Sequence, residues 1–483
     1  MICITVTPSS RTLAKADLLN AARHGDIIEL CLDHFSKDPD IDDLIRAVDK
    51  PIIISCRRKQ DGGQWEGTEE ERLLMLRRAI AAGPAYIELD LDIANDVPRF
   101  GSTQRVISFT RLDRPETDID RIFDDAANAR ADIVKFTWPT PTLGAAWPLL
   151  VAVSQKRRLP VVGMGLGRPE LTFSLLGLRY GSPWIYAALE KGMEAHDGQA
   201  TVFELNDTYH ASDIDSKTRF IAVSGFGESQ TLTTRILNAA FKELDLNVRC
   251  LPIELEDVSD LKRMLDILKI RAIIVGNQHG SSILELADHV DAHDSESGYL
   301  NLLLKRDNGW HGYNTLWRSG LKALESVISE SGKSLSKMNL LVIGNGGIAD
   351  SIVYALTRRE GLVSVCGPKD KLAQQTAQKN SCRFVPYQNL YETLADVVII
   401  ADPNISMGSQ HGQINPSVIK ADMTMLDVSD LPFETEFMAE ARERGANTIN
   451  TAGIYTQLLE AQFKAISGKE LPESAFLKGL SDE

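Results

Sequence analysis

The chain has 483 residues, of which 43% are hydrophobic and 25% are charged, as in an ordinary globular protein long enough for two to four domains. Its formal net charge of −15 supplies no broad basic face, which argues against nucleic acid or an anionic membrane as a partner of the whole molecule. The six cysteines form no CxxC pair, so we expect reduced thiols. No apolar run approaches the ~20 residues of a membrane span, and the first residues lack a signal-peptide pattern. We therefore expect a cytoplasmic protein.

Eight short β-rich runs recur through the first two hundred residues. They are "ICITVT" from Ile2, "IIELCLD" from Ile27, "PIIISCR" from Pro51, "YIELDLD" from Tyr86, "RVISFT" from Arg105, "DIVKFT" from Asp132, "PVVGMGL" from Pro160 and "WIYAAL" from Trp184. Segments with helical periodicity, such as "EEERLLMLRRAIAA", separate most of them. Because alternating strands and helices require parallel strands joined by crossovers, we predict a (β/α)8 TIM barrel over residues 1–207, shorter than the ~250 residues typical of that fold.

A polar, turn-forming segment, "NDTYHASDIDSKTR" from Asn206 to Arg219, predicts the end of this barrel. Strand and helix signals resume with "FIAVSG", "TRILNAAFKELDL" and "RAIIVGN", and "LLVIGNGGIADSIVYALTRREGLVSVCG" then reads as strand, glycine turn, helix and strand. We predict a two-lobed α/β module, with one lobe over 218–325, a Rossmann lobe over 338–432 and C-terminal helices over 433–483 that return to the first of these lobes.

The glycine turn "IGNGGIAD" is a candidate dinucleotide site. Gly344, Gly346 and Gly347 follow an apolar strand and open a helix, where backbone N–H groups can approach a pyrophosphate. Ala349 stands where the third glycine of the usual motif would lie, and the alternative is a tight turn without a ligand. The next strand ends in "VCGPKDK", which offers neither the acid typical of NAD sites nor the arginine typical of NADP sites, although Lys369 could reach a phosphate. The choice of cofactor stays open.

Lys135 lies in "ADIVKFT", an apolar run typical of a strand. A lysine in such a run either extends its amine to water or holds it in a pocket where the amine can react.

With a barrel first and a Rossmann-containing module second, the chain resembles the fused type I 3-dehydroquinate dehydratase and shikimate dehydrogenase of the aromatic amino-acid pathway. The resemblance covers nearly the whole length. It implies that Lys135 is the Schiff-base lysine, because the family carries that lysine on the sixth barrel strand in a run similar to "ADIVKFT". An amine in apolar surroundings loses its proton more readily, and it can then attack a ketone and make the α-proton acidic as an iminium.

Other barrel positions match the family in part. The resemblance implies substrate-binding roles for Glu29 in "IIELCLD", for Arg57 with Asp61 in "CRRKQDGG", and for Gln199 in "HDGQ". The alternative for each is an ordinary solvated or structural side chain.

Four barrel positions depart from the family. Cys31 replaces an arginine, Thr110 replaces the general-base histidine, Ser174 replaces a carboxylate-binding arginine, and Ala195 replaces a serine. Threonine cannot act as a base near neutral pH, which removes a typical ~10²- to 10⁴-fold of catalysis. As a hypothesis, Arg168 in "LGRPEL" takes over carboxylate binding, because barrel sites are built from such loops; Arg168→Ala should then weaken binding of a carboxylate ligand.

The second module keeps some family positions. Thr231 and Thr233 in "SQTLTTRILNAAF" match the hydroxyls that bind the shikimate carboxylate, with helix capping as the alternative. Asn301 in "YLNLL" matches a substrate-binding asparagine, and Asn314 in "GYNTL" lies in a family motif.

The catalytic pair of the dehydrogenase is replaced. Gly280 stands where the family has its lysine, and Leu316 stands where it has its aspartate, so both proton transfer and orientation of the hydroxyl are lost. His279 is a hypothetical substitute acid or base, with a structural role as the alternative.

Three functions follow from these observations. The first is a bifunctional enzyme of the shikimate pathway that dehydrates 3-dehydroquinate through Lys135 and reduces the product with a nicotinamide, NADP by resemblance. The second is a catalytically reduced homologue that keeps both folds for ligand binding or regulation. The third is a Schiff-base enzyme with a changed substrate. We lean towards an enzyme that takes small carboxylate substrates and uses no metal, and the sequence leaves the oligomeric state open.

Overall fold

The computed structural model describes residues 1–483 except 142, 168–169, 228, 254–260, 277–278, 409, 411–412 and 481–483. The chain divides into two compact units. The first comprises Met1–Arg219 and Asp245–Glu256, and the second comprises Phe220–Leu244 and Asp257–Glu483. The predicted boundaries at 207, 325 and 432 are finer than this division and stay predictions. Arg168, the hypothetical carboxylate ligand, lies outside the described residues.

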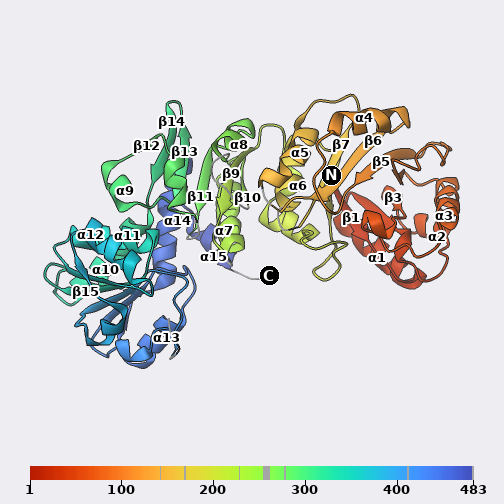
Figure 1. The fold of residues 1–483 in the computed structure, drawn as a ribbon. Coiled ribbons are helices and arrows are strands. Elements are labelled where there is room, and N and C mark those ends of the chain that lie inside the picture. Colours follow the sequence, from red (N-terminus) through yellow and green to blue (C-terminus); the bar gives the residue numbers. More distant parts are fainter. Residues whose placement is uncertain are drawn as a thin grey trace. The chain divides into compact units, whose positions relative to one another are not determined.

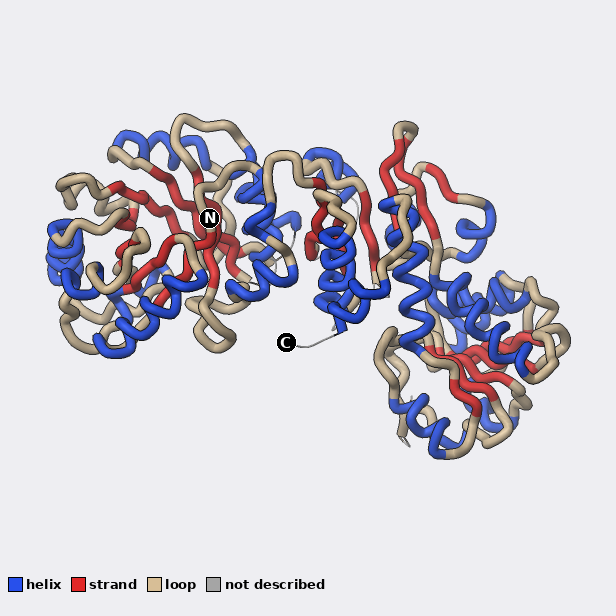
Figure 2. Tube along the Cα trace, turned by 180° about the vertical axis from the view of Figure 1, so that it is seen from behind, coloured by secondary structure: helices blue, strands red, loops and turns tan. Residues whose placement is uncertain are grey.

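Eight parallel strands form the sheet of the first unit (Figures 1 and 2). They are β1 (Ile2–Val6), β2 (Ile27–Cys31), β3 (Ile52–Ser55), β4 (Tyr86–Asp90), β5 (Gln104–Thr110), β6 (Ile133–Pro139), β7 (Val161–Leu166) and β8 (Ile185–Ala187). Their order is β7-β6-β5-β4-β3-β2-β1-β8, and the two end strands, β7 and β8, contact each other. All eight predicted strands are present, and the prediction of a barrel-like parallel sheet is confirmed.

Helices connect most of these strands. They are α1 (Arg11–His24), α2 (Ile41–Ile45), α3 (Glu69–Ala81), α4 (Ile119–Asn128), α5 (Leu143–Ser154) and α6 (Glu170–Arg179). Helix α3 begins at a capping box in which Thr68 and Glu71 satisfy each other's backbone N–H groups. The connection from β4 to β5 contains turns and no helix, because Pro98 and Gly101 interrupt a segment too short for a stable helix. The barrel therefore departs from a strict (β/α)8 pattern.

The interior of the barrel is arranged in layers, since alternate residues of each strand point inward. The lower layer is apolar and includes Ile27, Ile53, Val106 and Ile133. Two residues further along the strands come Thr5, Glu29, Glu88, Ser108 and Lys135, all buried. The sheet register pairs Thr5 with Glu29 and Ser108 with Lys135, so polar groups from neighbouring strands meet at one level.

The first lobe of the second unit holds strands in the order β9-β11-β13-β14-β12. Their bounds are β9 (Arg219–Ser224), β11 (Ala272–Val275), β12 (His289–Val290), β13 (Leu302–Arg306) and β14 (Gly309–Tyr313), while β10 (Val248–Pro252) lies in the segment grouped with the first unit. The helices of this lobe are α7 (Ser229–Glu243), α8 (Leu261–Ile267), α9 (Ala292–Ser297) and α10 (Leu316–Glu330).

The second lobe is a Rossmann-type parallel sheet in the order β17-β16-β15-β18-β19-β20. The strands are β15 (Asn339–Ile343), β16 (Leu362–Cys366), β17 (Arg383–Phe384), β18 (Val397–Ile400), β19 (Thr424–Asp427) and β20 (Asn447–Thr448), with helices α11 (Gly347–Thr357), α12 (Asp370–Lys379) and α13 (Glu436–Glu443). The predicted two-sheet module with a Rossmann lobe is confirmed.

The C-terminal helices α14 (Thr451–Ser467) and α15 (Glu473–Leu480) pack back on the first lobe of this unit. Helix α15 lies along α7, where Ser474 Oγ donates to the Glu243 carboxylate at 2.6 Å. From α14, Tyr455 shares a hydrogen bond of 2.7 Å with Thr233. The chain end thereby closes one side of a cavity between the two lobes.

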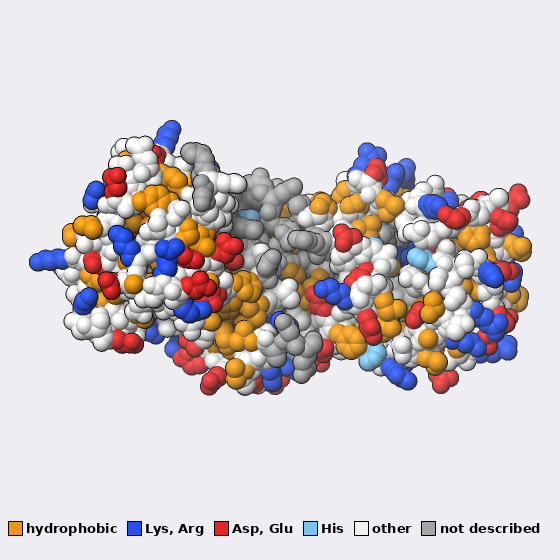
Figure 3. Space-filling model, turned by 90° about the horizontal axis from the view of Figure 1, so that it is seen from below, with side chains coloured by type: hydrophobic (Ala, Val, Ile, Leu, Met, Phe, Trp, Pro, Cys, Tyr) orange, Lys and Arg blue, Asp and Glu red, His pale blue; other side chains and the backbone are white. Residues whose placement is uncertain are grey.

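The surface carries mixed charge. On the face seen in Figure 3, acidic and basic side chains are interspersed among hydrophobic ones. No helix in the described part of the chain is both long and apolar enough to cross a membrane. The described residues also contain no group of three or more His, Cys, Asp or Glu placed to hold a metal ion.

Candidate functional site

Lys135 lies inside the barrel on β6 with only 1% of its surface exposed. Its Nζ is 2.9 Å from Glu88 Oε2 and 4.4 Å from the centre of the Tyr186 ring. The sequence predicted apolar surroundings for this amine; the structure instead gives it a carboxylate partner. Glu88 was not among the predicted site residues.

The buried residues Glu29, Glu88 and Lys135 and the partly buried Arg57 form what we call the buried charged layer. Arg57 donates from Nε to Glu88 Oε1 at 3.1 Å and from Nη2 to Glu88 Oε2 at 3.2 Å, and it also donates to Glu29. Anion and cation therefore alternate, and the formal charges cancel.

The pKa values of this layer reflect that alternation. Burial by itself would raise the pKa of Glu88, but the positive charges of Arg57 and Lys135 outweigh it and hold the pKa well below its ordinary value. Burial would likewise lower the pKa of Arg57, and the carboxylates of Glu29 and Glu88 raise it instead. Glu88 is thus ionised beside the lysine amine at neutral pH.

The loop after β8 contributes Gln199 to the same region. Its Nε2 donates to Thr5 Oγ1 at 3.3 Å, and Thr5 in turn donates to Glu29 Oε2 at 3.3 Å. Gln199 Oε1 accepts the N–H of Ala195 at 2.8 Å, which fixes the loop. The structure thus brings four predicted residues, Lys135, Glu29, Arg57 and Gln199, into one connected group.

His196 lies in this loop and was not among the predicted site residues. Burial lowers the pKa of His196 to about 4, with a further contribution from the positive charges of Arg57 and Lys135. A hydrogen bond to the Asp197 carbonyl acts in the opposite direction. The imidazole is therefore neutral at physiological pH and within electrostatic reach of both cations.

Asp61 is placed apart from the buried charged layer. It pairs with Arg58 Nε at 2.5 Å and not with Arg57, and it lines a separate cavity of about 680 Å³ together with Asp90 and Thr110. Burial raises the pKa of Asp90 to about 6, against the opposing effect of Arg72. The predicted grouping of Asp61 with Arg57 is not what the structure shows.

Three barrel positions that differ from the resembled family lie in different surroundings. Cys31 is buried and accepts from Ser55 Oγ at 3.5 Å, and burial raises its pKa well above the ordinary value. Ser174 is buried on α6. Thr110 lies at the end of β5, with no imidazole at that position.

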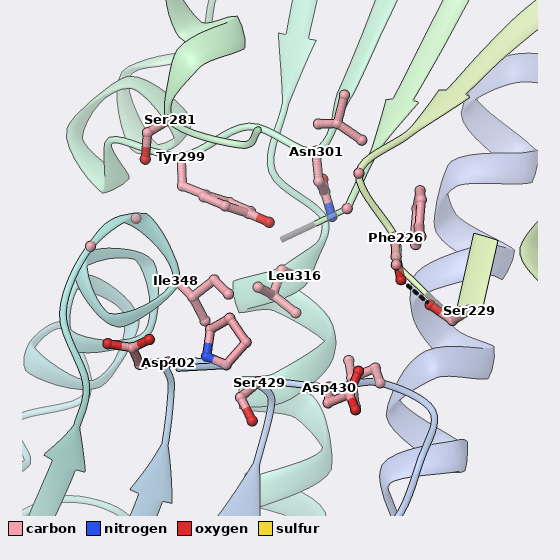
Figure 4. Close-up of a pocket in the computed structure, with 18 of the residues that line it drawn as sticks. Phe226, Ser229, Ser281, Tyr299, Asn301, Leu316, Ile348, Asp402, Ser429 and Asp430 are labelled. Carbon is pink, nitrogen blue, oxygen red and sulfur yellow. Dashed lines mark hydrogen bonds between the residues drawn. The ribbon is translucent and has the colours of Figure 1, made fainter. Parts of the chain in front are cut away.

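The second unit contains a cavity of about 540 Å³ between its two lobes (Figure 4). The described lining residues are Gly225, Phe226, Gly227, Ser229, Val275, Gly276, Ser281, Tyr299, Asn301, Leu316, Asn345, Gly346, Gly347, Ile348, Asp402, Pro403, Asn404, Ser429, Asp430, Leu431, Tyr455 and Leu458. His279, the hypothetical acid or base, is not among them.

The Tyr299 ring lies directly against the backbone of Gly280, the position where the resemblance implied a lysine. A Cβ at position 280 would overlap the Tyr299 ring, and a Cβ at Gly347 would lie 2.7 Å from it. In Figure 4 the Tyr299 hydroxyl points into the cavity, between Asn301 and the apolar side chain of Leu316. Burial raises the pKa of Tyr299, so its hydroxyl stays protonated at neutral pH.

The predicted asparagines are held by protein groups. Asn301 donates from Nδ2 to Thr315 Oγ1 at 3.0 Å and accepts the Thr315 N–H at 2.9 Å. Asn314 donates to Ser351 Oγ at 2.7 Å and to Ser297 Oγ at 3.0 Å. Asn301 still lines the cavity, whereas Asn314 is not among its described lining residues.

The structure places neither Thr231 nor Thr233 in the cavity. Thr231 is exposed on α7, and Thr233 is buried, donating to the Ser229 carbonyl at 2.8 Å. Helix α7 begins at Ser229, and this residue lines the cavity instead. The carboxylate-binding role of the two threonines stays a prediction, and neither is among the described residues that line the cavity.

The glycine turn has the expected backbone shape but an acidic neighbour. Gly346 has a φ of 92°, which favours glycine, and it precedes the first turn of α11. The Asn345 N–H donates to Asp402 Oδ2 at 3.1 Å, and a Cβ at Gly367, at the end of β16, would lie 2.6 Å from Asn345 Oδ1. A pyrophosphate at this turn would lie beside the buried carboxylate of Asp402. The side chain of Asn345 already lies over the end of β16, next to Gly367. These residues do not fit a nicotinamide dinucleotide.

Comparison with known proteins agrees with this two-part arrangement. Residues 2–216 match the family described as type I 3-dehydroquinase. A chloroplastic bifunctional 3-dehydroquinate dehydratase/shikimate dehydrogenase of Arabidopsis thaliana is 23% identical over 508 residues, covering 100% of this chain and 84% of that protein. Shikimate dehydrogenase (NADP(+)) of Aquifex aeolicus is 28% identical over 276 residues, covering 56% of this chain and 98% of that protein. A solved shikimate dehydrogenase from Aquifex aeolicus is 25% identical, covers 56% of this chain and 100% of that one, and has a TM-score of 0.49.

The fold and sites define a two-part α/β protein in which a barrel with a buried strand lysine precedes a Rossmann-containing module. Along its full length, the chain is a homologue of the fused type I 3-dehydroquinase and shikimate dehydrogenase proteins of the shikimate pathway, at low identity.

Proposed function

We propose that the first unit is a Schiff-base lyase that dehydrates 3-dehydroquinate, a small cyclic keto acid, to 3-dehydroshikimate. The observation that carries this proposal is the placement of Lys135, buried with its Nζ 2.9 Å from Glu88 and connected through Arg57 to Glu29. A cytoplasmic location in the shikimate pathway goes with this proposal.

The chemistry requires a nucleophilic amine at a fixed position. The Lys135 ammonium first releases a proton, and its free amine then attacks the ketone carbon. The released proton goes to the hydroxyl of the resulting carbinolamine, which departs as water and leaves an iminium. The iminium makes the neighbouring C–H acidic; removal of that proton and departure of the β-hydroxyl as water forms the new double bond. Hydrolysis of the iminium then releases the product and restores the amine. Glu88 and Arg57 orient the amine and balance its charge.

Removal of the α-proton requires a base. Thr110 cannot perform that step, so we expect turnover slower by about 10²- to 10⁴-fold than in a barrel with an imidazole base. Formation of the iminium does not need that base and should persist.

Borohydride reduction in the presence of 3-dehydroquinate tests the proposal, because it converts an iminium to a stable secondary amine. Peptide mass analysis of the whole chain should place the adduct at Lys135. The matched control is Lys15→Met, since Lys15 is exposed and pairs with Asp43; it should leave the adduct unchanged. A folded protein without an adduct at Lys135 contradicts the proposal.

A second function, the catalytically reduced homologue, is favoured by a specific observation. The Tyr299 ring fills the space above Gly280, and Leu316 is apolar, so positions 280 and 316 carry neither a lysine nor an aspartate, and no lysine is among the described residues that line the cavity. Family resemblance would assign NADP-linked reduction of 3-dehydroshikimate to this unit. Because its residues do not fit the nucleotide, we derive no reduction step, and absence of both the Lys135 adduct and NADPH oxidation would support this second function.

A further inference from the structure

We propose that the hydroxyl of Tyr186 donates a hydrogen bond to the ketone oxygen of the substrate while the Lys135 amine attacks the ketone carbon. This assigns a further catalytic residue to the barrel, and it rests on the lyase function proposed above. Tyr186 lies on β8, where it pairs with Cys3 of β1.

Tyr186 is a buried phenol with an unused donor. Its side chain is 2% exposed, and its hydroxyl has no hydrogen-bond partner in the described part of the chain. The residues that pack around it, such as Ile27 and Val162, are apolar. A phenylalanine would fill the same space without burying an unpaired hydroxyl, which costs stability. Packing alone therefore does not explain the hydroxyl.

The ring of Tyr186 lies beside the reacting amine. Lys135 Nζ lies over this ring, 4.4 Å from its centre. When the amine bonds to the ketone carbon, the ketone oxygen is two bonds from Nζ. An oxygen so close to Nζ is within reach of a hydroxyl on the rim of the same ring.

Other donors around the amine already have protein acceptors. Thr5 donates to Glu29, and Gln199 donates to Thr5. Arg57 donates to the carboxylates of Glu29 and Glu88. The phenol contrasts with these groups, because its hydrogen has no acceptor among the described residues.

The protonation state of Tyr186 suits a donor. Burial and the carboxylates of Glu29 and Glu88 raise the pKa of its hydroxyl well above the ordinary value, so it stays protonated at neutral pH. Attack by the amine moves the electron pair of the C=O bond onto the oxygen, and a donor fixed there stabilises that charge. The two protons that convert this oxygen to water both come from the Lys135 ammonium, and the phenol keeps its own.

A second hydroxyl without a partner in the described chain lies nearby, at Thr137. It is on the same face of β6, two residues after Lys135. The amine extends away from it, because its partner Glu88 is aligned through Val106 with Ile133, two residues before Lys135. We therefore assign the ketone oxygen to the phenol.

Tyr186→Phe tests the inference, because it removes the hydroxyl and keeps the ring. The full chain is mixed with 3-dehydroquinate, portions are reduced with borohydride at successive times, and peptide mass analysis follows the adduct at Lys135. We expect the maximal rate of adduct formation to fall about 10²-fold, the usual loss for one donor to a developing oxyanion. The concentration that gives half of that rate should change little, since the donor acts mainly in the transition state.

Two variants serve as controls. Tyr86→Phe removes a phenol hydroxyl from the same barrel, where the Tyr86 ring packs 5.2 Å from that of Trp184, and it should leave the rate unchanged. Thr137→Val should also leave it unchanged. A slower rate in Thr137→Val but not in Tyr186→Phe would assign the ketone oxygen to the threonine and overturn the inference.

Urea unfolding gives a second readout. Because its hydroxyl has no partner among the described residues, Tyr186→Phe should leave the unfolding midpoint unchanged or raise it. A lower midpoint would show that the hydroxyl serves the fold, for example through a buried water, and would overturn the inference. Equally fast adduct formation in Tyr186→Phe and wild type would overturn this inference alone. A wild-type chain that forms no adduct would overturn it together with the lyase function.

Discussion

The ring of Tyr299 and the backbone of Gly280 are packed so closely that any side chain at position 280 would overlap the ring. The absence of a side chain at position 280 and the position of the Tyr299 ring are therefore structurally coupled. Tyr299 is 2% exposed and is part of the core of the second unit, so it cannot move aside without cost.

Gly280→Ala should lower the free energy of unfolding by about 1–3 kcal/mol, the usual cost of overpacking. Urea unfolding measures this change. In a double-mutant cycle, Tyr299→Ala should remove most of the penalty, because it opens the space that the new methyl group needs. Gly320→Ala is the control: its Cβ would lie 3.4 Å from the nearest heavy atom, and it sits in α10. Simple additivity of Gly280→Ala and Tyr299→Ala would show that the two positions are not coupled.

Lys135→Met should destabilise the first unit by about 3–5 kcal/mol, because it removes one charge from a buried alternating set. The added change Glu88→Gln should recover part of that loss by restoring neutrality. Urea unfolding at pH 7 compares the single and double variants. If the double variant is less stable than Lys135→Met alone, the charge balance is not what holds this layer together.

His196 should titrate near pH 4, which NMR of its ring protons can follow. Its pKa is below the value of an unfolded chain, so the stability it contributes is complete above about pH 6.5 and is lost as the pH falls towards 4. His196→Gln should therefore reduce the acid sensitivity of unfolding across this range. Titration near pH 6.5 would mean that the imidazole is solvated and away from Arg57 and Lys135.

Asp90 should act in the opposite sense, because its pKa is raised to about 6. The folded chain then holds a proton that the unfolded chain has lost, so stability falls as the pH rises from about 4 to 6. Two pKa units correspond to about 3 kcal/mol. The difference in unfolding free energy between wild type and Asp90→Asn should vary with pH over this interval; a constant difference would contradict the raised pKa.

Much of the fold could be predicted from the sequence, because β-branched runs and helical periodicity are local signals. The missing helix between β4 and β5 shows the limit, since the length of that connection alone did not reveal it. Glu88 could have been predicted as a site residue from the strand "YIELDLD". Every second residue of a barrel strand points into the barrel, so Glu88 and Asp90 lie on the same inward face as Tyr86.

The second unit was harder to predict. Motif matching selected Thr231 and Thr233 by spacing, but α7 begins at Ser229, Thr231 is exposed, and the Thr233 hydroxyl is held by the Ser229 carbonyl and by Tyr455. Tyr299 and Asp402 have no local signal at all, because their importance depends on contacts with Gly280 and Asn345, which are far away in the sequence.

The buried charged layer has a consequence for how such chains evolve. Because Glu29, Arg57, Glu88 and Lys135 neutralise one another, replacing Lys135 alone would leave an excess negative charge inside the barrel. Selection for folding alone would then preserve the lysine in a lineage that had stopped using it. A lysine retained in this strand therefore shows that the barrel is intact. It shows that the barrel is an active enzyme only if the lysine amine is also found to react.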